Sequence, residues 1–155
     1  MTIEIEEAIE SGDLVALYEF RDALSEGERV TLNEMIYDIA LEKLEDAFSL
    51  GQTLDLEIAQ ERAILRGVYE YAFICLEQAN HHDATACFEQ LADVCAKPSF
   101  KVAMQMLEAV AYKEVDMPSF FKYYCHEHEV KEDFYYVSFK EEVYTLLEEV
   151  QSLKS

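Results

Sequence analysis

Glycine and proline are scarce in this chain, whose 155 residues include four Gly and two Pro. A β-sandwich or β-barrel needs turn residues every ~8–12 residues, so this scarcity argues against both architectures. The sequence also contains no Walker glycine loop, no Gly-x-Ser-x-Gly elbow and no Gly-x-Gly-x-x-Gly fingerprint. It therefore offers no phosphate-binding loop and no hydrolase nucleophile of these kinds.

Basic residues are also few. The chain has 12 Lys and Arg against 33 Asp and Glu, which gives a formal charge of −21. Such a charge opposes unaided approach to phosphate backbones and to anionic lipid headgroups. We therefore expect a protein partner of unknown identity, with no direct nucleic-acid contact and no membrane contact. The sequence leaves a homodimer open.

The pattern of a secretory leader is missing as well. The first residues, MTIEIEEAIE, carry acids where a signal peptide has basic residues. No later segment approaches the ~18 consecutive apolar residues of a membrane span. We expect a cytoplasmic protein.

Apolar residues make up 51% of the chain and charged residues 29%, which fits one soluble domain over residues 1–155. Nearly every long apolar pattern follows helical spacing. The predicted fold is all-α, a single-domain irregular bundle of about seven to eight helices. Repeat-like packing of helical hairpins is the alternative arrangement.

The positions of the helices follow from apolar stripes and breaks. Two short helices are expected on either side of 11–13, where Asp13 is the N-cap of the second. A central helix should contain residues 58–79, with Asp55 able to start it. Gly67 within it should mark a close helix crossing, with a kink as the alternative. Further helices are expected at 32–50, 84–96, 99–114, 118–128 and 132–153.

One window has a faint likeness to a tetratricopeptide unit. Ala72, Ala84, Phe88 and Pro98 lie close to the small, small, aromatic and proline positions of that repeat. The aromatic and glycine residues usual in its first helix are missing, and the next window of ~34 residues does not repeat the pattern. The sequence therefore identifies no repeat family.

The segment Cys125-His126-Glu127-His128-Glu129 contains residue types that bind zinc. On a helix only Cys125 with His128 or Glu129 would share a face, so these three are weak metal candidates. A di-iron carboxylate site is excluded because no histidine has a glutamate three residues before it. We expect no metal, no cofactor and no catalytic residue.

Cysteine usage leads to the same expectation. No Cys-x-x-Cys pair occurs among the four cysteines, and their neighbours are mostly apolar. We therefore predict buried, free thiols rather than ligands, nucleophiles or disulfides.

Aromatic residues are concentrated near the C-terminus, where residues 100–144 hold 11 of the 19 Phe and Tyr. Several are adjacent in sequence, so one of each pair should point away from the core of a helix. Exposed rings suit partner binding, because they bury a large area with little loss of rotamer entropy. The candidate partner-binding residues are Phe120, Phe121, Tyr123, Tyr124, Tyr135 and Tyr136. The alternative is that these rings close one end of the bundle.

Three functions remain, and we favour a non-enzymatic interaction module, an adaptor or small chaperone-like protein, that binds through the aromatic residues. The second is an acidic antagonist of a basic partner, such as an immunity protein or a nucleic-acid mimic. Residues 1–61 contain 17 acidic and three basic side chains, a charge of −14. The candidate surface of such an antagonist consists of Glu4, Glu6, Glu7, Asp13, Glu19 and Glu34. The third is a metal-binding protein or enzyme that uses Cys125, His126 and His128, with His81 and His82 nearby.

Overall fold

The computed structural model describes residues 2–125, 134–136 and 139–154. These residues form eight α-helices and one π-helical turn, and contain no β-strand beyond isolated bridges. The predicted all-α class is therefore confirmed. The elements are α1 (Ile3–Ser11), α2 (Leu14–Ala23), α3 (Glu26–Ser49), α4 (Ala59–Glu77), α5 (His81–Val94), α6 (Pro98–Tyr112), α7 (Met117–Ser119), η1 (Phe120–Tyr124) and α8 (Glu142–Lys154). None of the described helices is both long and apolar enough to cross a membrane.

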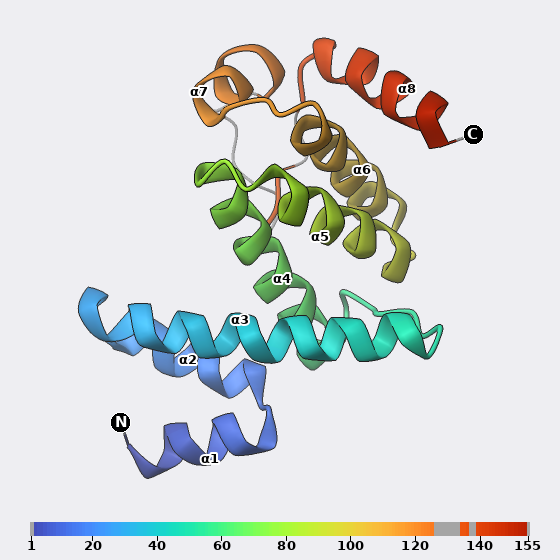
Figure 1. Ribbon diagram of the computed structural model, residues 1–155. Coiled ribbons are helices and arrows are strands. Elements are labelled where there is room, and N and C mark those ends of the chain that lie inside the picture. Colours follow the sequence, from blue (N-terminus) through green and yellow to red (C-terminus); the bar gives the residue numbers. More distant parts are fainter. Residues whose placement is uncertain (1, 126–133, 137–138, 155) are drawn as a thin grey trace.

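The helices form two groups joined by α4 (Figure 1). Helices α1, α2 and α3 lie at one end, and α5, α6 and α8 lie at the other. Each helix from α1 to α5 packs against the helix that follows it in sequence, and α6 packs against α8. A cluster of buried apolar side chains extends from Ile5 in α1 to Val143 in α8.

The two short helices at the N-terminus begin and end where the sequence predicts. Gly12 ends α1 in the left-handed region with φ of 71°, a conformation that glycine adopts without steric cost. Asp13 is the N-cap of α2, and its Oδ1 accepts a hydrogen bond of 3.2 Å from the Ala16 N–H. This turn positions α1 against α2.

The crossing of α3 and α4 depends on Gly67, as predicted. A Cβ atom at position 67 would lie 2.6 Å from the Ala40 Cβ of α3, which is closer than two carbon atoms can pack. Gly67 and Ala40 are both buried. The small residues let the two backbones approach closely, and the cost of glycine within a helix is offset by this contact.

The prediction that Asp55 can start the central helix is wrong. The helix begins at Ala59, and the preceding loop packs against the end of α5. The Leu54 N–H donates a 2.7 Å hydrogen bond to the Val94 carbonyl, and Leu54 forms a parallel bridge with Cys95. This pairing joins the loop to a distant segment, a contact that no local pattern reveals.

The prediction of a last helix over residues 132–153 is also wrong at its start, because α8 begins at Glu142. Residues 134–136 are not helical, and the Tyr136 N–H donates a 3.0 Å hydrogen bond to the Tyr69 hydroxyl. Phe139 forms an antiparallel bridge with Cys125. Tertiary contacts of the backbone and aromatic rings override the helical spacing in this segment.

The helix predicted at 118–128 is shorter than expected. Helix α7 and the π-helical turn η1 end at Tyr124, and Cys125 has an extended backbone. The remainder of the predicted helix, at 126–128, lies outside the described residues.

Helix α8 packs along α6. Its buried contacts are made by Val143 and Val150. Two ion pairs flank these contacts: Lys113 Nζ lies 2.6 Å from Glu149 Oε2, and Lys154 Nζ lies 2.6 Å from Glu108 Oε2. The C-terminal helix is therefore held by a short apolar seam with a charge pair on each side.

Candidate functional site

A polar network joins α2, α3 and α4 at the acidic end of the molecule. The Tyr18 hydroxyl donates a 2.8 Å hydrogen bond to Glu70 Oε1, and Arg21 Nη1 donates to the same oxygen at 3.0 Å. Arg21 also donates to Asn33 Oδ1 at 3.2 Å. Arg66 Nε lies 3.4 Å from Glu70 Oε2. Glu70 of α4 is therefore the acceptor at the centre of this network.

Both arginines of the network also lie over the Tyr18 ring. The guanidinium carbons of Arg21 and Arg66 are 4.5 Å and 4.0 Å from its centroid. Burial and the nearby Glu70 raise the pKa of the Tyr18 hydroxyl, so it stays a hydrogen-bond donor. The network connects α2, α3 and α4, and within it the positive charge of Arg21 is paired with Glu70.

The other two bases of residues 1–61 are also engaged within the chain. Arg29 donates through Nε to the Leu24 carbonyl at 2.9 Å and through Nη2 to the Asp22 carbonyl at 3.2 Å. The end of the Lys43 side chain packs over Gly12, with its Cε 3.0 Å from the position of an added Cβ. All three cations in this region therefore make local contacts, and none pairs with the acids of α1.

Most acidic side chains of α1, α2 and α3 point to solvent. Within the part of the chain that the structure describes, twelve exposed acids in α1–α3 form no ion pair within 4.0 Å. They are Glu4, Glu6, Glu7, Glu10, Glu19, Glu26, Glu28, Glu34, Asp38, Glu42, Glu45 and Asp46. Their negative potential is therefore not neutralised by nearby cations of the described chain.

The six acids of the predicted antagonist surface all lie on or beside these helices. Glu4, Glu6 and Glu7 of α1, Glu19 of α2 and Glu34 of α3 are exposed. Asp13 differs, because its carboxylate accepts hydrogen bonds from Gln60 Nε2 at 2.7 Å and from the Ala16 N–H. These hydrogen bonds lower the pKa of Asp13. Asp13 therefore caps α2 and contacts the first turn of α4.

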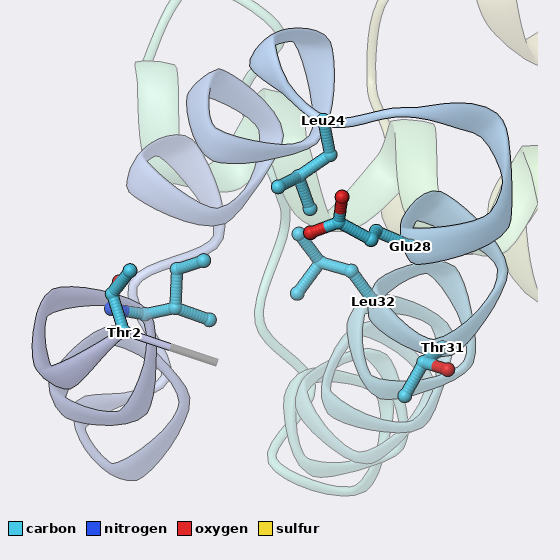
Figure 2. Close-up of a pocket in the computed structure, with 6 residues that line it drawn as sticks. Thr2, Leu24, Glu28, Thr31 and Leu32 are labelled. Carbon is cyan, nitrogen blue, oxygen red and sulfur yellow. The ribbon is translucent and has the colours of Figure 1, made fainter.

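A groove lies between α1 and the first turns of α3, beside the end of α2 (Figure 2). Its volume is about 410 Å³, and its lining residues are Thr2, Ile5, Leu24, Glu28, Thr31 and Leu32. Ile5 and Leu32 are buried and form apolar floor, with the half-buried Leu24 beside them. Thr2, Glu28 and Thr31 are exposed at the rim. The Glu28 carboxylate accepts one hydrogen bond of 2.9 Å, from the Ser25 hydroxyl.

Sequence reasoning missed this groove. Leu24 and Leu32 belong to apolar helix stripes, a pattern that fits the core as well as a groove wall. These residues line a groove instead of filling the core because α1 leaves a gap beside α3. The position of α1 depends on the turn at Gly12. The repeated acids near the starts of α1 and α3 are the only local signal at this position.

The six candidate aromatic residues occupy different environments. Phe120 and Tyr135 are 0% and 1% exposed and belong to the core. Phe121, Tyr124 and Tyr136 are half-buried, and Tyr123 is 50% exposed. Ring contacts connect this group to the core, with Phe120 6.2 Å from Phe73 and Tyr135 4.9 Å from Phe100 between centroids. Most of this aromatic surface therefore faces the interior.

The structure describes one of the three candidate metal ligands, Cys125. Over residues 2–125, 134–136 and 139–154, no group of three or more His, Cys, Asp or Glu could hold a metal ion. Cys125 is buried, and His126, His128 and Glu129 lie outside the described residues. His81 and His82 form the first turn of α5, where His82 is exposed.

The four cysteines are free and buried, as predicted. Burial raises the pKa of the Cys75 and Cys95 thiols, and raises that of Cys87 to about 12. A raised pKa keeps these thiols protonated and therefore poor nucleophiles.

Comparisons of the chain with protein-family models, with curated proteins and with solved structures found no match.

Proposed function

We propose that this protein is a non-enzymatic interaction protein whose acidic helices α1, α2 and α3 bind a basic protein partner. The observation that carries the proposal is the division of charge within these helices. Their three cations make contacts within the chain, whereas twelve of their exposed acids form no ion pair among the described residues. This arrangement leaves the acids available to an external cationic surface.

A concentrated negative surface acts first on the rate of association. It attracts a basic partner over a Debye length of ~8–10 Å and increases the encounter rate, while it repels nucleic acids and anionic membranes. A protein with this property is suited to neutralise or cover a basic surface of its partner. We propose that it does so in the cytoplasm, an environment compatible with four free thiols.

Binding through the aromatic surface is the second candidate. Its support is Tyr123, which is 50% exposed and lies next to the half-buried Tyr124. The ammonium of Lys122 is 5.1 Å from the centroid of the Tyr123 ring, so the local charge differs from that of the acidic helices. This surface predicts binding that responds little to salt.

The test compares two triple variants that remove the same charge from opposite ends of the molecule. Glu4, Glu6 and Glu7 are replaced by Gln in α1, and Glu141, Glu142 and Glu148 are replaced by Gln at α8 as the matched control. All six residues are exposed. The partner is identified by affinity purification from the native host, and binding of the purified partner is measured between about 50 and 200 mM salt.

We expect the α1 variant to lower affinity about tenfold, mainly through slower association, and the control to change it less than about twofold. Affinity for the wild type should fall steeply with salt. The proposal is wrong if both triple variants bind like the wild type and Tyr123→Ala weakens binding instead. That result would favour the aromatic surface.

A further inference from the structure

We propose that the groove between α1 and α3 seats a large apolar side chain from a basic segment of the partner. This inference rests on the proposed function and adds a specific contact to it. The segment would place an aliphatic or aromatic anchor on Ile5, Leu24 and Leu32, and would direct an adjacent Lys or Arg toward Glu28 (Figure 2).

The shape and floor of the groove support an apolar anchor. Ligand pockets in proteins range over ~300–1,000 Å³, and the groove, at about 410 Å³, is at the lower end of this range. Its floor contains two residues of the core, Ile5 at 4% and Leu32 at 1% exposure. An anchor in this position would extend the apolar core outward and remove its own surface from water.

The rim of the groove decides the charge of the occupant. Glu28 is exposed there, and its carboxylate has one hydrogen bond, from Ser25, among the described residues. A carboxylate has about four acceptor positions, so Glu28 can accept further donors. The neighbouring base, Arg29, already donates to the carbonyls of Asp22 and Leu24. None of the described residues that line the groove carries a positive charge.

The acids around the groove strengthen the requirement for a positively charged occupant. Glu4 and Glu6 lie in the first turn of α1, and Glu26 lies with Glu28 in the first turn of α3. A second copy of this chain, with a charge of −21, would be repelled by these residues, as would a nucleic acid. A neutral segment would bury part of the Glu28 carboxylate without a counter-charge, which is costly. A segment that combines Lys or Arg with an apolar anchor meets both requirements.

The experiment uses two synthetic peptides with the same number of lysines. One has leucines at helical spacing among the lysines, and the other has serine at each leucine position. Both are titrated against the wild type and against Thr31→Phe, in which the new ring occupies the groove. Val30→Phe is the matched control, because Val30 is on the same helix, is 60% exposed and does not line the groove.

We expect the leucine-lysine peptide to bind about tenfold more tightly than the serine-lysine peptide. Thr31→Phe should remove most of that difference and leave the serine-lysine affinity unchanged, whereas Val30→Phe should change neither affinity by more than about twofold. Glu28→Gln should weaken the leucine-lysine peptide severalfold without altering the thermal melting of the protein. Melting curves of all three variants establish that they fold.

Two other results have different consequences. If both peptides bind with equal affinity and Thr31→Phe has no effect, the groove inference is overturned and the acidic surface remains supported. If neither peptide binds at low salt, the proposed function fails and the groove inference fails with it.

Discussion

Gly67 of α4 lies so close to Ala40 of α3 that a Cβ atom at position 67 would be 2.6 Å from the Ala40 Cβ. The same added atom would lie 3.5 Å from the Tyr18 hydroxyl, which belongs to α2. One glycine therefore governs the approach of three helices. The Tyr18 hydroxyl in turn donates a hydrogen bond to Glu70, as does Arg21.

The first prediction concerns this crossing. We expect Gly67→Ala to lower the free energy of unfolding by about 1–3 kcal/mol, because overpacking outweighs the ~1 kcal/mol gain in helix propensity. Gly27→Ala is the control, since no atom lies within 4 Å of its added Cβ, and it should stabilise the protein by about 0.5–1 kcal/mol. Denaturant unfolding of both variants measures the two effects. Equal stabilisation by both would contradict the close crossing.

The second prediction concerns the network at Glu70. Glu70→Gln should destabilise the protein by about 1–3 kcal/mol, because Arg21, with 13% of its side chain exposed, loses its counter-charge. Tyr18→Phe should cost about 1 kcal/mol, the net value of one hydrogen bond. Glu77→Gln, at an exposed position of the same helix, should change stability by less than about 0.5 kcal/mol. A double-mutant cycle of Tyr18 and Glu70 should give a coupling energy above about 0.5 kcal/mol, and additive effects would argue against the network.

The third prediction uses the buried carboxyl of Glu108. Burial raises the pKa of Glu108 above its ordinary value of 4.5 and outweighs the lowering by Lys154. Since the folded-state pKa is the higher one, ionised Glu108 opposes folding above that pKa, and this opposition disappears as the pH falls through it. Glu108→Gln cannot titrate at this position. The free energy of unfolding of Glu108→Gln minus that of the wild type should therefore be larger at pH 7 than at about pH 5. Unfolding of both proteins at several pH values measures this difference.

Lys154→Met provides the complementary variant. It leaves the Glu108 carboxylate, which is 5% exposed, without the ammonium 2.6 Å away. We expect a loss of about 1–3 kcal/mol at neutral pH that becomes smaller at acidic pH. A loss that is the same at every pH would show that Lys154 contributes packing rather than charge.

The fourth prediction concerns the thiols. The buried cysteines should react with a thiol reagent at pH 8 much more slowly in the native protein than in denaturant, because burial limits access. The raised pKa of Cys87, about 12, should make this thiol especially unreactive. Counting of modified cysteines by mass spectrometry follows the reaction. A thiol that reacts at the same rate in both states would be exposed in the native protein.

The prediction of the helices succeeded where local spacing and capping determine the structure. Asp13 and Gly12 mark the ends of two helices through contacts with residues three or four positions away. It failed where distant segments pair. Leu54 is held by Val94, and Tyr136 is held by Tyr69, and neither partner can be identified from a helical period.

The sequence by itself determined the all-helical class, the excess of acid in residues 1–61 and the break between the two N-terminal helices at Gly12. These properties depend on composition and on neighbours within one or two helical turns. Only the tertiary structure decided that Arg21 contacts Glu70, that Phe120 and Tyr135 lie in the core, and that α1 leaves a groove beside α3. The physical reason is that these contacts join residues far apart in the chain. Their formation depends on how the helices pack, and the same apolar stripe can face a core or line a groove.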